Sequence, residues 1–218
     1  SVVSPIELTS AFATLANRGI YNEPISILRI EDKDGVLIEN FTSYASEAIP
    51  EETAYIVTYM LRTAIDAGTG QAARSKYNFQ RPAAGKTGTT QDFADAWYVG
   101  FTPQLAGGVW VGFDDQRVSF TGDYGQGARA ALPIWAIFMH DVYEQLNLPV
   151  EDFIPPASGN VIPAKFCKES IYELGDPKLY SPDCRAGVLT DIINIKDIPT
   201  TFDAFRDTTI KIFDRYQF

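Results

Sequence analysis

The feature that most restricts the fold is a block of three β-rich segments with very short connections. The segments are residues 83–90, 94–101 and 107–113, and Thr102-Pro103-Gln104 forms a turn between the last two. A parallel crossover needs a dozen residues or more, so connections this short allow only antiparallel neighbours. The block therefore predicts an antiparallel sheet at the centre of the fold.

Helix and turn signals surround this block. Ser4-Pro5-Ile6-Glu7 is a capping box with proline at the first helical position, and a second helix is expected to begin near Pro50, where two glutamates follow. Asp32-Lys33-Asp34-Gly35 is expected to form the turn of a β-hairpin, and Pro133 to open a third helix. The chain is thus predicted to be an α+β protein, an antiparallel sheet flanked by helices.

The hydrophobic periodicity of the sequence weakens near residue 150. Prolines then interrupt a stretch with little periodicity, so we expect residues 1–149 to form the main domain and residues 150–218 a loop-rich appendage. Cys167 and Cys184 in the appendage are either two buried free thiols or a disulfide. An extracytoplasmic location favours the disulfide, which would contribute roughly 3 kcal/mol through loop entropy. With His140 as the single histidine, the ligands are too few for a metal site, and no metal is expected.

The net charge argues against a nucleic-acid partner, and the hydropathy argues against a transmembrane segment. The net charge of −10 repels nucleic-acid phosphates and anionic lipids, so no nucleic-acid partner is expected. The apolar stretch around Ala130 to Met139 contains Pro133 and is shorter than the roughly 20 residues that span a bilayer, so no transmembrane segment is expected. Because the chain begins at Ser1 without a methionine or a leader, we expect it to be part of a longer protein.

The stretch AAGKTGTT, residues 83–90, fits two unrelated chemistries. A phosphate-binding P-loop would place its first glycine at position 80, which is Gln80, and Pro82 removes a backbone N–H that phosphates would need. A P-loop must also lead into a helix, whereas this stretch leads into a β-rich segment. The phosphate interpretation therefore fails.

The alternative is a strand beside a cleft that holds a carboxylate. Lys86 offers a fixed positive charge, and Thr87 and Thr89 offer hydroxyl donors. Gly88 has no side chain, so a substrate can lie against the backbone as an added strand, and the strand's N–H groups can stabilise an oxyanion. A match of three residues is weak by itself, and a solvated strand end is the simpler explanation of it.

The surrounding sequence makes the carboxylate interpretation specific. Residues 83–115, AAGKTGTTQDFADAWYVGFTPQLAGGVWVGFDD, resemble the transpeptidase domain of the class A penicillin-binding proteins, bifunctional enzymes that build peptidoglycan. Three other stretches are similar to the same family and occur in the same order as in its members: SPIELTSAFATLANRG, MLRTAIDAGTGQAAR and GARAALPIW. The resemblance covers roughly residues 1–147. It implies the fold shared by penicillin-binding proteins and serine β-lactamases.

The resemblance also implies a reaction and roles for named residues. In this family a serine in an S-x-x-K motif attacks the penultimate D-Ala of a stem peptide, D-Ala leaves, and an amine of a neighbouring stem peptide resolves the acyl-enzyme. By motif matching, Lys86, Thr87, Gly88, Thr89 and Thr90 bind the substrate, with Lys86 also counted as catalytic. The N–H of Thr89 would be one oxyanion donor. β-Lactams would use the same contacts, and no cofactor is implied.

This chain departs from the family pattern in one respect. It contains no Ser-x-x-Lys, and its one Ser-x-Asn, Ser158-Gly159-Asn160, lies after Lys86 instead of before it. We therefore expect the C-terminal half of a serine-type D,D-transpeptidase domain, with the nucleophile upstream and no activity in this fragment alone. The partners implied are D-Ala-D-Ala stem peptides, β-lactams, the N-terminal half of the domain and an upstream glycosyltransferase domain.

The resemblance further implies that the longer protein is anchored to the membrane by an N-terminal segment and faces the periplasm or the cell exterior. The alternative function is a binding or sensor module whose parent has lost its nucleophile. The upstream sequence discriminates between the two, because an S-x-x-K followed by an S-x-N supports the enzyme.

Other residues invite functional interpretations that we consider weaker. Gly68-Thr69-Gly70 resembles part of a dinucleotide fingerprint but follows a helix, so we interpret it as a helix end. We expect Asp95 to be a strand-end contact and not a catalytic acid. Trp97, Trp110 and Trp135 are expected to lie in the core.

Overall fold

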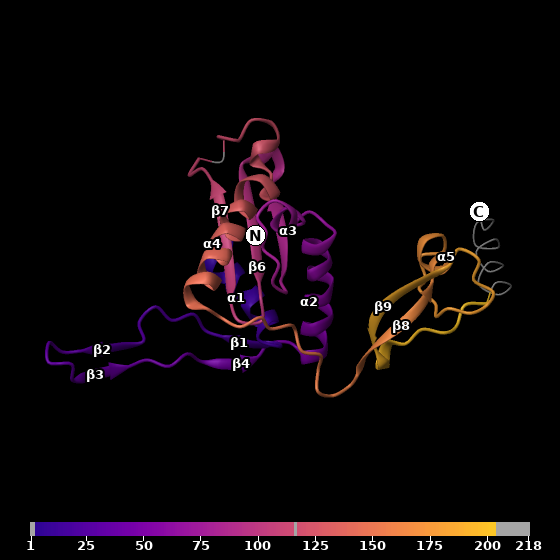
Figure 1. The fold of residues 1–218 in the computed structure, drawn as a ribbon, viewed down its shortest axis with the longest axis horizontal. Coiled ribbons are helices and arrows are strands. Elements are labelled where there is room, and N and C mark those ends of the chain that lie inside the picture. Colours follow the sequence, from indigo (N-terminus) through magenta and orange to yellow (C-terminus); the bar gives the residue numbers. More distant parts are fainter. Residues whose placement is uncertain (1–2, 116, 204–218) are drawn as a thin grey trace. The chain divides into compact units, whose positions relative to one another are not determined.

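The structure is a computed structural model that describes residues 3–115 and 117–203. The chain divides into two compact units, Ser1–Ile154 and Pro155–Phe218 (Figure 1). Each unit has its own β-strands and its own buried residues, and each is described by itself. Within the described residues, no helix combines the length and the apolar character needed to cross a bilayer.

A three-stranded antiparallel sheet forms the centre of the first unit, as the sequence predicted. Its strand order is β5 (Ala84–Thr89), β6 (Asp95–Phe101), β7 (Ala106–Gly112). Lys86 lies opposite Val99, and the register continues without a shift along both strand pairs. The α+β prediction is therefore confirmed, and β5 is an edge strand of this sheet.

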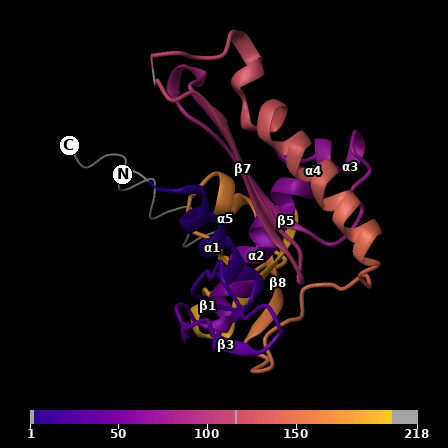
Figure 2. The same cartoon turned by 90° about the vertical axis from the view of Figure 1, so that its left-hand side faces the viewer.

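Helices cover both faces of this sheet at close range (Figure 2). Two adjacent glycines of β7 make this possible: a Cβ at Gly108 would meet Thr9 of α1 (Pro5–Ala16), and a Cβ at Gly107 would meet Trp135 of α4 (Gly127–Leu146). Since successive residues of a strand face opposite sides, α1 and α4 lie on opposite faces. The helix α2 (Glu51–Asp66) contacts β5.

The core of the first unit lies between the sheet and α4. Trp135 is 1% exposed, and its ring centroid lies 5.2 Å from that of Phe79 and 5.1 Å from that of Tyr98. The indole Nε1 of Trp135 donates to the carbonyl oxygen of Gly100 at 3.2 Å. Other residues of this buried cluster are Ile65, Ala73, Ala83, Ala131, Leu132, Ala136, Met139 and Tyr143.

Two helix starts test the signals used in the sequence. The capping box of α1 is present, with Ser4 Oγ accepting from the amide of Glu7 and Glu7 Oε2 accepting from that of Ser4. The predicted start of the third helix at Pro133 is wrong, because α4 begins at Gly127 and contains Pro133. Proline is frequent in the first turn of a helix, but a proline does not always mark a helix start. The start of α4 is set instead by its close approach to β5, described below.

A hairpin arm, residues 23–44, projects from the first unit (Figure 1). At its base β1 (Ile20–Asn22) pairs with β4 (Ala45–Glu47), and beyond it β2 (Arg29–Glu31) pairs with β3 (Leu37–Asn40). The turn forms where it was predicted, since Asp32 Oδ1 accepts from the amides of residues 34 and 36, at 2.9 Å each. The arm exposes the apolar residues Ile25, Ile27, Leu28, Ile30, Val36, Leu37 and Ile38.

One arginine organises the segment that leads into β5. The guanidinium of Arg74, in α3 (Ala72–Ser75), donates to the carbonyl oxygens of Phe79 at 2.7 Å and Arg81 at 2.6 Å. It also pairs with Asp66 at the end of α2. This side chain therefore fixes the path from α2 to the edge strand. The remaining short elements of the unit are the 3₁₀ turns η1 (Gln91–Phe93) and η2 (Gly122–Gly125).

The second unit contains an antiparallel hairpin that the sequence did not predict. Its strands are β8 (Val161–Cys167) and β9 (Val188–Asn194). The short helix α5 (Lys168–Tyr172) and the 3₁₀ turn η3 (Ile195–Asp197) follow β8 and β9 in turn.

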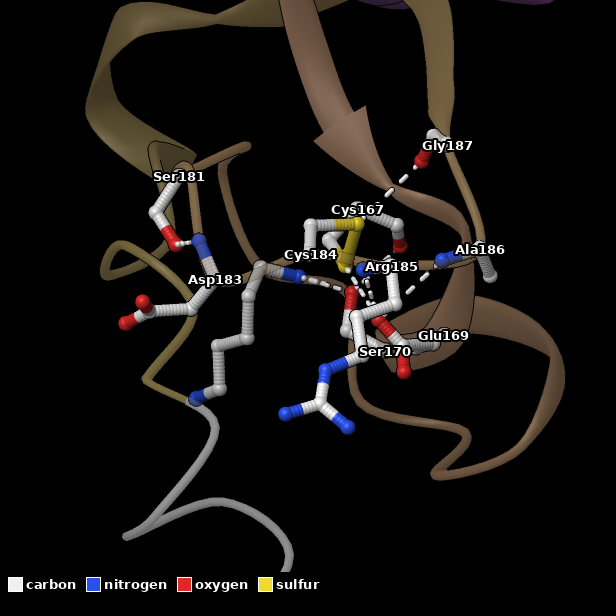
Figure 3. The surroundings of a disulfide bond; sticks show 10 residues. Cys167, Glu169, Ser170, Ser181, Asp183, Cys184, Arg185, Ala186 and Gly187 are labelled. Carbon is white, nitrogen blue, oxygen red and sulfur yellow. Dashed lines mark hydrogen bonds between the residues drawn. A yellow bond between two sulfur atoms is a disulfide. The ribbon is translucent and has the colours of Figure 1, made fainter.

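A disulfide between Cys167 and Cys184 joins the end of β8 to the loop before β9 (Figure 3). Beside it, Glu169 Oε2 accepts from the backbone amides of Arg185 at 2.6 Å and Ala186 at 3.3 Å. The hydroxyl of Ser170 donates to the carbonyl oxygen of Cys167 at 2.7 Å. The disulfide and these hydrogen bonds hold the loop against the hairpin.

Candidate functional site

A cleft of roughly 790 Å³ lies between α1 and the sheet of the first unit. All five residues from Lys86 to Thr90 line it, so the structure brings the predicted substrate-binding residues together in one place. Its other lining residues are Val3, Pro5, Leu8 and Phe12 from the α1 side and Asp95, Trp97, Val99 and Trp110 from the sheet. One wall is therefore apolar, and the other carries an ammonium group and hydroxyls.

The outer edge of β5 has no strand partner among the described residues. The amide of Thr90 donates to the carbonyl oxygen of Asp95 at 3.0 Å, so residues 90 and 95 form a hydrogen-bonded pair of the antiparallel ladder. Such pairs alternate with non-hydrogen-bonded pairs, so the N–H and C=O of Thr89 and Thr87 point away from β6. The carbonyl oxygen of Thr87 accepts from Lys86 Nζ. The other outward groups are placed to pair with an extended peptide at the edge.

Lys86 is an exposed cation at the middle of β5. Its Nζ donates to the carbonyl oxygen of Thr87 at 3.0 Å and to Thr87 Oγ1 at 3.3 Å. In the part of the chain that the structure describes, no acidic side chain forms an ion pair with Lys86. The ammonium group is therefore available to an anion in the cleft.

Thr69 is a neighbour of the site that sequence reasoning missed. Its Oγ1 lies 2.8 Å from Thr87 Oγ1, within hydrogen-bonding distance. Thr69 belongs to Gly68-Thr69-Gly70, which does end a helix, since the amide of Gly70 donates to the carbonyl oxygen of Ala64. The two flanking glycines do not indicate this contact, because a Cβ on Gly68 or on Gly70 would meet Ala64 in α2 and not the strand.

Thr89 joins the site to α4. Its Oγ1 accepts a hydrogen bond from the backbone amide of Gly127 at 3.0 Å. Gly127 is the first residue of α4, and the preceding Gln126 provides no side-chain cap. Sequence reasoning missed this residue too, because nothing local indicates which strand lies against the start of a helix.

A polar contact closes the turn after β5. Thr90 Oγ1 accepts from the amide of Asp95, and Asp95 Oδ1 accepts from the indole N–H of Trp110, both at 2.8 Å. Asp95 is thus a contact at the end of a strand, as expected. Trp135 lies in the core, but the expectation for Trp110 is wrong: it is 39% exposed and lines the cleft, because it lies on the α1 face near the end of β7.

The cleft is suited to binding an anion. Its charged lining residues are Lys86 and Asp95, and Asp95 already accepts from Trp110. Among the described residues, the one cluster of possible metal ligands lies in the second unit: Cys167, Glu169 and Cys184. Their two sulfur atoms are joined to each other (Figure 3), so they are not the thiolates that a metal needs.

The penicillin-binding protein transpeptidase domain matches residues 2–132 of this chain. The chain belongs to this family. Penicillin-binding protein 1A of Aquifex aeolicus is 40% identical over 155 residues, which cover 71% of this chain and 20% of that protein. The chain therefore spans about a fifth of the length of this curated relative.

Solved structures of penicillin-binding proteins agree with this membership. Penicillin-binding protein 1A from Haemophilus influenzae superposes with a TM-score of 0.76 at 23% identity, covering 92% of this chain and 33% of that one, which supports the fold. PonA1 from Mycobacterium tuberculosis gives a TM-score of 0.58 at 28% identity, covering 70% of this chain and 41% of that one. The resemblance to the class A proteins inferred from the sequence is thus confirmed.

Proposed function

We propose that this chain is part of a serine-type D,D-transpeptidase that cross-links peptidoglycan stem peptides through an acyl-serine intermediate. The observation that carries the proposal is the grouping of Lys86, Thr87 and Thr89 on the unpaired edge strand of a cleft. A donor with the terminal D-Ala-D-Ala sequence has a carboxylate one residue beyond the bond that reacts. It therefore needs a cation and hydroxyl donors beside a strand edge that can hold a peptide backbone.

Each of the residues in and beside β5 has its own role in binding the donor peptide. The Lys86 ammonium and the hydroxyls of Thr87 and Thr89 hold the terminal carboxylate of the donor. Gly88 leaves space for the donor to lie along β5, and the outward N–H of Thr89 donates to the oxyanion that forms when the carbonyl is attacked. Thr69 holds the Thr87 hydroxyl in place. β-Lactams, which carry a carboxylate beside a reactive carbonyl, bind through the same groups.

The rest of the catalytic apparatus is proposed to lie upstream in the same protein. The chain contains no S-x-x-K motif, so the serine nucleophile, its lysine and the S-x-N motif belong to the N-terminal half of the domain. In this proposal residues 1–149 are the C-terminal half. An upstream glycosyltransferase domain and an N-terminal membrane anchor complete an enzyme that faces the periplasm or the cell exterior.

The test is covalent labelling with a fluorescent penicillin, followed by a denaturing gel. The 218-residue chain is compared with the same chain extended through its native upstream residues. We expect label on the extended protein and none on the chain alone, because the nucleophile lies upstream. Label on neither protein would indicate a binding or sensor module that lacks catalysis, and label on the short chain would contradict the placement of the nucleophile.

Two lysine variants of the extended protein separate the site from general effects. Lys86→Ala removes the proposed carboxylate-binding cation, and the labelling rate is expected to fall by about tenfold or more, the usual worth of a hydrogen bond to a charged group. Lys33→Ala removes a lysine whose side chain is 90% exposed on the hairpin arm, and labelling should be unchanged. Equal labelling of the two variants would contradict the role of Lys86.

A further inference from the structure

The start of α4 lies directly against the proposed carboxylate-binding strand. A Cβ placed on Gly127 would lie within atomic overlap of the carbonyl oxygens of Gly88 and Trp97, and 3.2 Å from the amide nitrogen of Gly88. Gly127 is buried, and a residue with any side chain would push α4 off the sheet at this point. The glycine is therefore required for contact between the helix start and the strand.

This contact includes a hydrogen bond with a defined direction. The amide of Gly127 donates to Thr89 Oγ1 at 3.0 Å, so the Thr89 oxygen is the acceptor. A hydroxyl that accepts one bond still has its own proton to donate. The Thr89 hydroxyl lies on the α4 side of β5, but β5 is an edge strand, and Thr89 is exposed and lines the cleft. Its proton is therefore available to a ligand that lies along this edge.

The same bond links the site to the electrostatics of the helix. The 20 residues of α4 place a partial positive charge at its N-terminus, and Gln126 offers no side chain to cap it. Thr89 takes the place of that cap from another element. Donation into its oxygen polarises the O–H bond and strengthens its donation to an anion, as in other chains of hydrogen bonds.

We propose that Gly127 is a positioning residue for the carboxylate site, which orients and polarises the Thr89 hydroxyl through its amide. This inference rests on the proposed function, since it assumes that the cleft holds a carboxylate. Affinity for the carboxylate then depends on where α4 begins, through a residue that does not touch the substrate.

The test compares acylation by a penicillin with acylation by its carboxyl methyl ester, using the extended protein with the complete domain. The ratio of the two second-order rate constants reports on recognition of the carboxylate and is insensitive to a uniform loss of active protein. We expect Thr89→Val to lower this ratio about tenfold, as for a lost hydrogen bond to a charged group, and Thr89→Ser to keep it within about twofold. A purely structural role for Thr89 would slow both ligands equally and overturn the inference.

Gly127 is tested by replacing it with glycolic acid, which changes its N–H to an ester oxygen without adding a Cβ. The acid-to-ester ratio should fall as it does for Thr89→Val, and the two changes together should lower it no further, because they act through one hydrogen bond. Gly127→Ala should also lower the ratio, provided that thermal unfolding shows an intact fold. The control is Gly107→Ala, whose Cβ would lie 3.2 Å from Trp135 Nε1, under α4 and away from Thr89. This variant should leave the acid-to-ester ratio unchanged.

Two failures are distinguishable. If the wild-type protein reacts faster with the free acid but the glycolate variant keeps the same ratio, the positioning role of Gly127 is wrong while the proposed function stands. If the wild-type protein is acylated by neither ligand, the proposed function fails and the inference fails with it.

Discussion

Two sheets of this molecule, β5–β7 in the first unit and β8–β9 in the second, are stabilised by different means. The three-stranded sheet has α4 packed on it through Trp135 and a cluster of large buried side chains, and the first unit contains no cysteine. The two-stranded sheet has a smaller buried cluster, made of Cys167, Cys184 and Phe202, and a disulfide is part of it. In the second unit, therefore, a covalent link adds to a small core, and an isolated two-stranded hairpin is only marginally stable.

The largest effect is expected from removing the centre of the first core. Trp135→Ala deletes a side chain that is 1% exposed and packs against Phe79 and Tyr98, and should lower the free energy of unfolding by about 3–5 kcal/mol. The matched control is Trp110→Ala, which removes a tryptophan that is 39% exposed and should cost less. Urea denaturation measures both, and equal costs would contradict the assignment of Trp135 to the core.

The second effect should be confined to the other unit. Replacing Cys167 and Cys184 together by alanine opens a cross-link between residues 17 apart in sequence. The loss should be roughly 3 kcal/mol on the loop-entropy estimate. Hydrogen exchange followed by mass spectrometry should show lost protection in residues 161–194 and unchanged protection in residues 84–112. Equal losses in the two sheets would show that the disulfide stabilises more than its own unit.

A smaller effect is expected from one buried hydroxyl of the second unit. Ser170 is fully buried, and its Oγ donates to the carbonyl oxygen of Cys167 and accepts from the amide of Lys178 at 2.9 Å. Ser170→Ala leaves both backbone groups without this partner, so it should cost about 1–3 kcal/mol. Exchange rates of the Lys178 amide measure the effect, and an unchanged rate would mean that water replaces the hydroxyl.

The smallest effect at neutral pH is expected from a buried hydroxyl of the first unit. Tyr98 is fully buried, and its hydroxyl has no hydrogen-bond partner among the described residues. Burial raises the pKa of Tyr98 well above its ordinary value of 10.0, with Arg74 opposing the shift. Tyr98→Phe removes an unpaired polar group, so near pH 7 the free energy of unfolding should stay the same or rise by about 1 kcal/mol.

The pH dependence of the same variant has a definite sign. Because the pKa of Tyr98 is higher in the folded chain, the unfolded chain gives up this proton first, at about pH 10. The stability contributed by the neutral phenol is complete below pH 10 and is lost as the pH rises toward the folded value. Tyr98→Phe should reduce this alkaline loss, leaving a residual slope from Tyr143, whose pKa is also raised by burial. An unchanged slope in urea titrations between pH 8 and 11 would contradict this account.

The parts of the fold that could be predicted from the sequence are those set by neighbours along the chain. The capping box at Ser4, the hairpin turn at Asp32 and the three-stranded sheet all rest on local hydrogen bonds or short connections. The hairpin β8–β9 was missed, because its strands are 20 residues apart and one of them contains Pro163, which reads as a loop signal.

The candidate site shows the same limit. Lys86 to Thr90 are consecutive, so their grouping was visible in the sequence. Thr69 and Gly127 reach the site through the packing of α2 and α4 on the sheet, and contacts between distant segments leave no periodic signal. The start of α4 was misplaced at Pro133 for the same reason, since the residue that fixes it touches another element.

The base of the hairpin arm has a consequence for insertions and deletions in this chain. Tyr21 and Ser46 are paired neighbours, so the chain leaves and re-enters the body of the first unit at one point. Changes of length in the outer part of the arm, residues 25–42, are therefore expected to leave α1 and α2 in place, whereas Glu23 and Pro24 line a pocket together with α1. The outer arm is thus a place where the surface of the first unit can change while the lining of the cleft stays the same.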